Sequence, residues 1–199
     1  MSHSRGLICV GGSDAQQHHA STLELRWAKG SLQIEPLLGL PQPLANMSGA
    51  LEGHSVYIFG GTATPTATNA LNTFYSMSLS PKQPGWRTLE PLPAAGRIFA
   101  TAAARDGSFY LFGGAALRAD ANGKPERVWL RESWRYSART GWKRLADLPR
   151  VAVAAPSPAP LVNGKFLILG GDDGAQVNTP PTKHTGFRRD VLAYDPKTD

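Results

Sequence analysis

The stretch VYIFGG at Val56–Gly61 is an apolar run that ends in two glycines, and the chain repeats this form three more times. The other copies are LICVGG (Leu7–Gly12), FYLFGG (Phe109–Gly114) and FLILGG (Phe166–Gly171). Successive copies are therefore spaced about 50 residues apart, a period typical of proteins built from stacked supersecondary units.

Each unit continues in the same way after its glycine pair. A polar loop leads to an alternating strand, then to a segment that ends in Leu-Pro, then to a strand of small residues. Trp86 and Trp142 occupy equivalent positions, six residues before Leu92 and Leu148. Four strands per unit at this period predict an all-β, kelch-type β-propeller. The alternating strands are expected at Ser21–Trp27, Asn72–Leu79, Glu132–Ala138 and Asp190–Asp195.

The strand before each glycine pair reads as a continuous apolar run, which indicates that both of its faces are covered. We expect these inner strands to end at their glycines, because the backbone there turns sharply and approaches a neighbour closely. The tryptophans are predicted to fill the wedge between sheets. Cys9 lies within the first of these strands, so we expect it to pack in the core.

Composition is that of an ordinary globular protein, with 41% hydrophobic and 18% charged residues in a chain of 199. We treat residues 1–199 as one partial propeller domain. No stretch approaches the roughly 18 apolar residues of a membrane span, so no membrane partner is predicted. The net charge is +6, but the basic residues are scattered, which argues against nucleic acid and favours a small anionic ligand.

The predicted units contain three, four, four and three strands, or about three and a half blades. Propellers close with about four to eight blades, because closure removes sheet edges. The sequence therefore predicts a piece of a longer ring, truncated at both ends, whose uncovered sheet faces promote self-association. The alternative is a four-bladed ring closed by pairing of the two termini.

Three longer segments are more specific than the repeat itself. GLICVGGSD, LPQPLANMSGALEGHSVYIFGG and KHTGFRRDVLAYDPKTD resemble the cyclically permuted mutarotase branch of the kelch proteins, which is similar to N-acetylneuraminate mutarotase (epimerase). The resemblance covers essentially the whole chain. It implies a six-bladed propeller, a sugar isomerase of carbohydrate metabolism that converts sialic acid anomers at its channel mouth, and a parent protein that is periplasmic or secreted.

Mutarotation requires one group to accept the anomeric hydroxyl proton and another to deliver a proton to the ring oxygen. The long polar loop from Asp172 to Arg189 offers candidates for these tasks. The family loop resembles His-Glu-Gly followed by basic residues; here His184 and Gly186 match, whereas Thr185 stands at the glutamate position. We predict that His184 is catalytic and that Asp172 and Arg188 bind substrate.

Two further residues are predicted to bind substrate because each begins a small-residue strand that could line the channel. They are Asn46 and Arg97, and a guanidinium is a suitable partner for the carboxylate of an acidic sugar. The alternative for Arg97 is a surface or inter-blade arginine. Aspartates that directly follow a strand, Asp172 included, are also common turn formers.

No metal or cofactor is predicted. His18 and His19 are adjacent, so they point apart in an extended segment and do not readily share a metal ion. The glycines occur as strand-ending pairs and not as nucleotide-binding loops. A second class of function stays open: a non-catalytic kelch module that binds a protein partner or a glycan through its loops, an interpretation that Thr185 favours.

Overall fold

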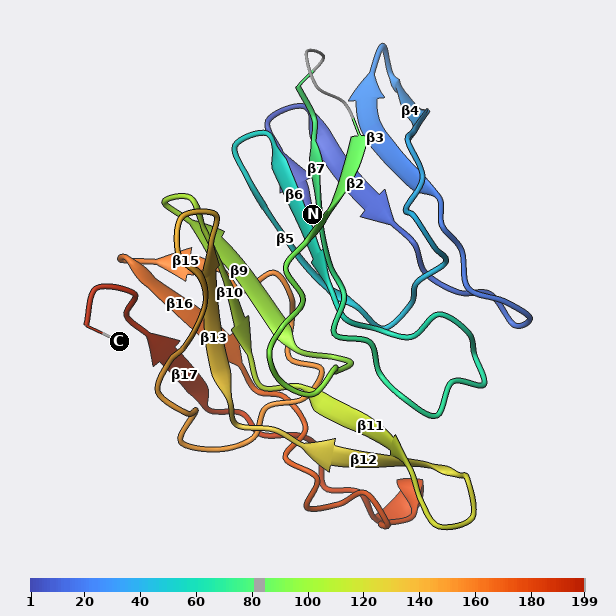
Figure 1. Ribbon diagram of the computed structural model, residues 1–199, viewed down its shortest axis with the longest axis vertical. Coiled ribbons are helices and arrows are strands. Elements are labelled where there is room, and N and C mark those ends of the chain that lie inside the picture. Colours follow the sequence, from blue (N-terminus) through green and yellow to red (C-terminus); the bar gives the residue numbers. More distant parts are fainter. Residues whose placement is uncertain (81–84, 199) are drawn as a thin grey trace.

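The computed structural model describes residues 1–80 and 85–198, and these residues form 17 β-strands and one short 3₁₀ helix (Figure 1). Every named strand pairing is antiparallel. Within the described residues, no helix has the length and apolar character needed to cross a membrane. The all-β prediction is therefore confirmed.

Four sheets and one hairpin contain all these strands. The first sheet has the order β1 (Ser2–His3), β2 (Gly6–Val10), β3 (Thr22–Ala28) and β4 (Ser31–Leu37). The second has the order β5 (Ser48–Glu52), β6 (Ser55–Phe59), β7 (Phe74–Ser78) and β8 (Gly85–Leu89). The third has the order β9 (Thr101–Arg105), β10 (Ser108–Phe112), β13 (Ser133–Ser137) and β14 (Gly141–Arg144). The fourth contains β15 (Leu161–Val162), β16 (Lys165–Leu169) and β17 (Val191–Tyr194), and the hairpin contains β11 (Ala115–Ala119) and β12 (Pro125–Trp129).

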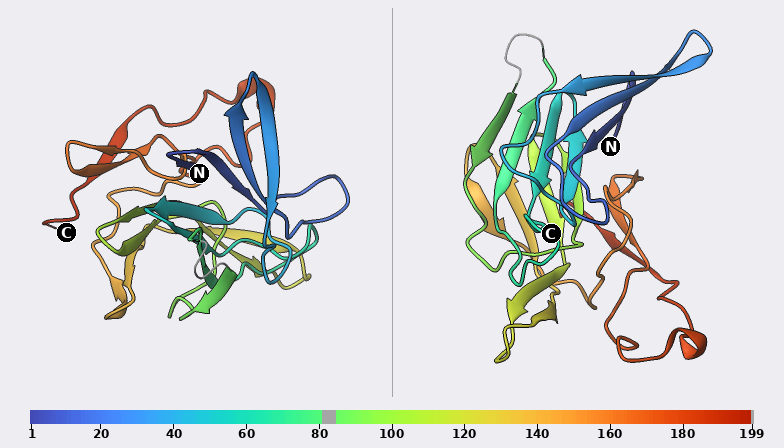
Figure 2. Two further views of the ribbon diagram at one scale, coloured as in Figure 1. Left: turned by 90° about the horizontal axis from the view of Figure 1, so that it is seen from above. Right: turned by 90° about the vertical axis from the view of Figure 1, so that its right-hand side faces the viewer.

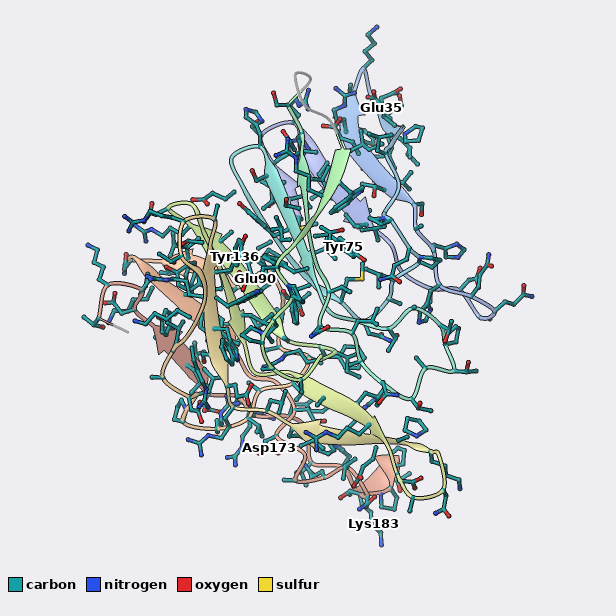
Figure 3. The ribbon with its side chains drawn as sticks, viewed as in Figure 1. Glu35, Tyr75, Glu90, Tyr136, Asp173 and Lys183 are labelled. Atoms are coloured by element: carbon teal, nitrogen blue, oxygen red, sulfur yellow. The ribbon has the colours of Figure 1, made fainter. Side chains whose placement is uncertain are left out.

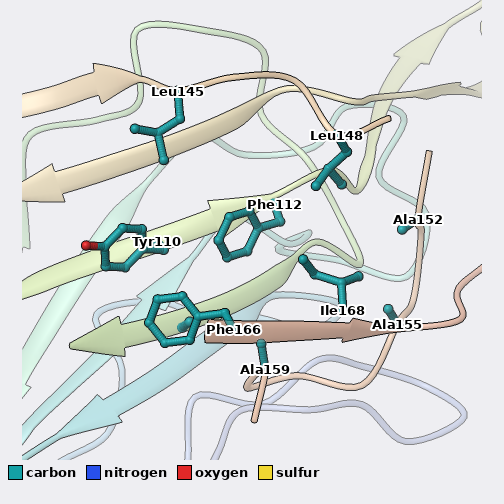
Figure 4. Close-up of a cluster of buried hydrophobic side chains, with 10 residues drawn as sticks. Tyr110, Phe112, Leu145, Leu148, Ala152, Ala155, Ala159, Phe166 and Ile168 are labelled. Carbon is teal, nitrogen blue, oxygen red and sulfur yellow. The ribbon is translucent and has the colours of Figure 1, made fainter. Parts of the chain in front are cut away.

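The four sheets are arranged radially in an arc, which Figure 2 shows from above. A separate cluster of buried apolar side chains lies between each sheet and the next. The cluster between the third and fourth sheets contains Tyr110, Phe112, Phe166 and Ile168 (Figure 4). Face-to-face packing of radial four-stranded sheets is the architecture of a β-propeller, as the repeat predicted.

The glycine pairs end the strands as expected. β2, β6, β10 and β16 each end at the residue before a pair, and each is the second strand of its sheet. Both Gly60 and Gly61 have positive φ, at 69° and 87°. A Cβ on Gly60 would collide with the carbonyl of Arg97, and one on Gly61 with the carbonyl of Ala45. The inner edges of the second and third sheets are the small-residue strands β5 and β9, and not the glycine-ended strands as expected. β5 and β9 contact each other across the two neighbouring sheets.

Trp86 connects the second sheet to the first, and Trp142 connects the third sheet to the second. The indole Nε1 of Trp86 donates to the carbonyl of Leu38 at 2.9 Å, and that of Trp142 donates to the carbonyl of Glu90 at 2.8 Å. Both acceptors lie two residues before the leucine of a Leu-Pro pair. The ring of Trp142 also packs on Phe74, with centroids 5.0 Å apart. The predicted role of the tryptophans between sheets is confirmed.

A second contact, here called the arginine bridge, occurs twice. In each case a guanidinium binds the carbonyl of the first glycine of a pair and the acidic residue directly before the third strand of that sheet. Arg97 binds the carbonyl of Gly113 at 3.2 Å and Glu132 at 2.8 Å. Arg150 binds the carbonyl of Gly170 at 2.9 Å and Asp190 at 2.8 Å. The recurrence indicates that the bridge stabilises the fold.

The described strands exceed the 14 expected from sequence by three. β1 completes the first sheet, although its two residues are too short to give a periodic signal, and backbone bonds between Met1 and Ile8 at 2.7 and 2.8 Å hold it in place. The other two strands form the β11–β12 hairpin, which lies inside a segment expected to be a polar loop. An Asn-Gly pair at Asn122–Gly123, a common hairpin signal, stands at its turn.

The expectation that Cys9 packs in the core is wrong. Its side chain is exposed, whereas its neighbour Ile8 is buried at 1% exposure. Alternation along β2 turns Ile8 toward the second sheet and Cys9 away from it. Leu7, which alternation places on the same face as Cys9, is also exposed, so an apolar run here does not imply two covered faces.

Candidate functional site

The loop between β16 and β17 encloses a cavity of about 380 Å³, here called the loop cavity. Its walls come entirely from residues 172–189, and they include four residues singled out from the sequence: Asp172, His184, Thr185 and Arg188. A backbone bridge between Val153 and Asp172 joins the start of the loop to the segment before β15. The short 3₁₀ helix Pro181–Lys183 lies in the same loop. Figure 3 labels two residues of this loop, Asp173 and Lys183.

Gln176 holds the two sides of the loop together. Its Nε2 donates to the carbonyl of Gly186 at 2.8 Å. Its Oε1 accepts from the backbone N–H of Thr185 at 2.9 Å and from the Thr185 hydroxyl at 3.0 Å. The Thr185 side chain therefore has a structural contact at the position where the family pattern has glutamate.

An ion pair joins Asp173 and Arg188 inside the cavity wall. Arg188 Nε donates to Asp173 Oδ2 at 2.6 Å, and the side chains are 20% and 58% exposed for Asp173 and Arg188. The hydrogen bond from Arg188 holds the pKa of the Asp173 carboxyl below its ordinary value, and a bond from the Ala175 N–H acts in the same direction. The same pair raises the pKa of Arg188. At neutral pH this ion pair thus places a carboxylate beside a guanidinium in the cavity wall.

The imidazole of His184 is oriented by its own loop. Its Nδ1 accepts from the backbone N–H of Gly186 at 3.0 Å, and its ring lies 5.0 Å from the ring of Phe187. A nitrogen that accepts a hydrogen bond carries no proton, so a neutral His184 carries its proton on Nε2. This tautomer offers a proton donor on the side of the ring away from Gly186.

Asp172 lies in the same cavity wall but its carboxylate also forms a turn. Oδ1 accepts from the backbone N–H of Gly174 at 2.8 Å. This is the turn-forming role that the sequence left open for an aspartate after a strand.

A second cavity of about 590 Å³, here called the hairpin cavity, lies between the inner edges of the sheets and the β11–β12 hairpin. Asn46 and Phe99 line it from equivalent positions of successive units, with positive φ of 60° and 55°. The backbone N–H of Phe99 donates to the carbonyl of Asn46 at 3.0 Å, and Ala154 continues this chain of bonds. The side-chain Nδ2 of Asn46 donates to the hydroxyl of Thr62 at 3.3 Å.

The structure therefore divides the predicted site residues among three places. His184, Asp172 and Arg188 meet at the loop cavity, and Asn46 lines the hairpin cavity. Arg97 lines neither of them: its side chain has no exposed surface and its guanidinium is bound in the arginine bridge. Burial lowers the pKa of Arg97, while the hydrogen bond to Glu132 opposes that shift. This placement matches the inter-blade alternative for Arg97 and gives no support to a substrate-binding role.

Two important residues of the loop cavity are not among the predicted site residues: Asp173, which the sequence offers as a candidate with the same turn-forming alternative as Asp172, and Gln176, which it does not single out. Asp173 is the second residue after a glycine pair, the same position that Asp14 has in the first unit, and an aspartate there is more often a turn former. Gln176 carries no local pattern that distinguishes it from other loop glutamines. Only the closure of the loop on itself brings it to Thr185.

Comparison with known proteins gives a consistent set of relatives. No family model matches the chain. It is 29% identical to an N-acetylneuraminate epimerase of Haemophilus influenzae over 156 residues, which cover 77% of this chain and 36% of the relative. It is 23% identical to one of Salmonella arizonae over 133 residues (66% and 32%), and 26% identical to one of Shigella sonnei over 132 residues (66% and 33%).

The chain is similar to N-acetylneuraminate epimerases. Its fold is similar to that of YjhT, with a TM-score of 0.72 and 14% identity over 92% of this chain and 51% of YjhT. This likeness shows a shared β-propeller fold. The match spans about a third of the length of the curated relatives and about half of YjhT. The resemblance to N-acetylneuraminate mutarotases (epimerases) that the sequence predicts is thereby confirmed.

Proposed function

We propose that this chain belongs to a carbohydrate-active β-propeller that binds N-acetylneuraminate at the loop cavity and exchanges its anomers. The observation that carries the proposal is the meeting of Asp173, His184 and Arg188 around one cavity. Its volume, about 380 Å³, is within the range of about 300–1,000 Å³ typical of small-molecule sites. The names of the relatives and the net charge of +6 support an acidic sugar as the ligand.

In this proposal Arg188 binds the sugar carboxylate. A planar guanidinium matches a carboxylate in two parallel hydrogen bonds. Arg188 must then leave Asp173 at least in part, and the hydrogen bond that holds the pKa of Asp173 low is weakened. Substrate binding would therefore make the Asp173 carboxylate more basic at the moment when a base is required.

Asp173 and His184 then act on different oxygens. Asp173 accepts the proton of the anomeric hydroxyl, and the Nε2–H of neutral His184 donates a hydrogen bond to the ring oxygen while the bond between that oxygen and the anomeric carbon breaks. The proton held by Asp173 then passes to the ring oxygen, which gives the open-chain ketone. Reclosure on the other face of the carbonyl reverses both transfers. In this scheme Asp173 takes the task that the missing glutamate at Thr185 leaves vacant.

The test of these two groups is NMR exchange between the anomers of N-acetylneuraminate, at a pH where spontaneous rotation is slow. Asp173→Asn and His184→Ala should each slow the exchange by about 10²- to 10⁴-fold, because the first removes the general base and the second removes the hydrogen bond that stabilises the developing charge on the ring oxygen. Binding should change little for His184→Ala. Asp14→Asn is the matched control, since Asp14 follows the first glycine pair in the same position and bonds His19 at 2.9 Å. Wild-type exchange at the background rate would refute the mutarotase activity.

Arg188→Ala tests the anion site separately. A charge-assisted hydrogen bond contributes about 1.5–3 kcal/mol, so the variant should bind the sugar roughly 10- to 150-fold more weakly by calorimetry. Arg189→Ala is the neighbouring control, because Arg189 lines the same cavity. An equal loss in both variants would indicate general electrostatic attraction and not a specific carboxylate contact.

The alternative is a non-catalytic kelch module that binds a protein or a glycan through its loops. The bonds between Thr185 and Gln176 favour it, because they occupy the position of the family glutamate with a purely structural contact. Binding of the sugar without any anomer exchange would support this alternative. A periplasmic or secreted parent and a six-bladed ring remain predictions, which cell fractionation and the structure of a longer chain would test.

A further inference from the structure

The hairpin cavity has chemistry of its own. Strand alternation places Arg127 and Trp129 on one face of β12, and register places Leu117 and Ala115 beside them on β11. Arg127, Trp129 and Leu117 line the cavity, and Phe99 lines it from the inner edge of the third sheet. An indole, a phenyl ring and a guanidinium therefore line one cavity, together with the amide of Asn46.

Among the described residues, no acidic partner neutralises the charge of Arg127. The described part of the chain gives Arg127 no ion pair, and its guanidinium lies 5.6 Å from the centre of the Phe99 ring. Glu126 also lines the cavity, but its register partner across the hairpin is Arg118, on the other face of the pleat. A cation held over an aromatic ring and left without a carboxylate is available for an anionic ligand.

The loop and hairpin cavities share a wall. Ala175 and Gln176 line the loop cavity, and the next two residues, Val177 and Asn178, line the hairpin cavity. Gly174 lies directly against the indole of Trp129, so close that a Cβ at this position would be only 2.9–3.0 Å from the ring atoms. One short segment thus separates a cavity that holds Arg188 from a cavity that holds Arg127.

We propose that the hairpin cavity is a second subsite for an acidic sugar unit, so that the two cavities together bind an oligosaccharide with a carboxylate on each ring. The reducing-end unit occupies the loop cavity, and the next unit stacks on the aromatic side chains and places its carboxylate on Arg127. The inference rests on the proposed sugar-binding function of the loop cavity. The volume of about 590 Å³ suits one sugar ring and its substituents.

The test compares calorimetric binding of monomeric N-acetylneuraminate with that of its dimer whose reducing end is free. The wild-type chain should bind the dimer at least tenfold more tightly than the monomer, as expected for one added charge-assisted hydrogen bond. Arg127→Gln should abolish this difference and leave monomer binding unchanged. Arg118→Gln is the matched control, because it removes the same charge from the opposite face of the same hairpin.

Each outcome decides the proposal. A dimer that binds no more tightly than the monomer overturns the subsite, as does an Arg127→Gln variant that loses monomer and dimer affinity equally. Absence of binding by both probes overturns the subsite as well. Failure of the proposed activity can be distinguished from failure of the subsite. If the wild-type chain prefers the dimer, this preference depends on Arg127 and no anomer exchange occurs, the subsite is supported and the mutarotase function is refuted.

Discussion

Gly174 connects the two cavities at the scale of a single residue. Its φ is 78°, in the left-handed region, and an added Cβ would lie 2.9 Å from a ring atom of Trp129. Values under 3.0 Å require one of the two groups to move. The backbone of Gly174 also donates to Asp172, so any movement here is transmitted to the wall of the loop cavity.

Gly174→Ala should therefore displace either the loop or Trp129, and weaken ligand binding at both cavities. The backbone strain alone costs about 1–2 kcal/mol for a residue with a Cβ in this region. Gly123→Ala is the control, since Gly123 has a φ of 75° and open space around its Cβ position. Thermal unfolding and sugar binding should be measured for both variants. Equal effects on binding would show that contact with Trp129 is unimportant.

The sequence identifies loop residues better than residues whose partners are distant. It predicts His184 and Arg188 together, and they do meet, because both lie in one loop whose ends are fixed by neighbouring strands. The contact of Arg97 with Glu132 depends on a separation of 35 residues. The residues around Arg97 in the sequence, GRIF at Gly96–Phe99, do not show whether its side chain lines the channel or forms the arginine bridge. Only the packing of the third sheet decides this.

At the scale of elements, the arginine bridge makes stability depend on pH. Burial raises the pKa of Glu132, but the hydrogen bonds from Arg97 and Trp134 outweigh it and hold the pKa below its ordinary value of 4.5. A carboxyl whose pKa is lower in the folded state stabilises the fold above its unfolded pKa. That contribution is lost as the pH falls through the folded value.

Glu132→Gln should lower the free energy of unfolding by roughly 1–3 kcal/mol at neutral pH, because it leaves the charge of buried Arg97 without a carboxylate. The difference from wild type should begin to shrink as the pH falls below about 4.5, and it should disappear once the pH has fallen through the lower pKa of the folded wild-type carboxyl, which is then neutral as well. Urea titrations at several pH values measure it. Glu126→Gln serves as an exposed control, and a difference that does not change with pH would contradict the ionic role of the bridge.

Elements with a repeated pattern are predictable, and those that interrupt the repeat are not. The glycine-ended strands occur where the apolar runs place them. The β11–β12 hairpin has the sequence of a polar loop, because its residues Arg118 and Glu126 are charged and a two-stranded hairpin buries little apolar surface. β1 depends entirely on pairing with β2 and has no pattern of its own.

At the scale of the whole molecule, the arc of sheets ends in an uncovered apolar face. The outer face of the first sheet presents Leu7, Trp27, Leu32 and Ile34, which are 48%, 75%, 52% and 59% exposed. Register places Leu7, Leu25 and Ile34 in one row across β2, β3 and β4, and Trp27 opposite Leu32 in the next. An apolar patch of this kind is unfavourable in water and promotes association.

We therefore expect the isolated chain to self-associate through this face, with a mass by light scattering that exceeds 21.3 kDa and rises with concentration. The double variant Trp27→Lys with Leu32→Glu replaces two apolar residues that face each other across β3 and β4, so it should reduce association. The sheet should still form, because opposite charges are tolerated directly across a strand pair. Ala138→Lys with Thr140→Glu makes the same charge change at an exposed turn of the third sheet and should have no effect. A wild-type chain that is a monomer at all concentrations would contradict the prediction, because the exposed rows would then be stable in water without a partner.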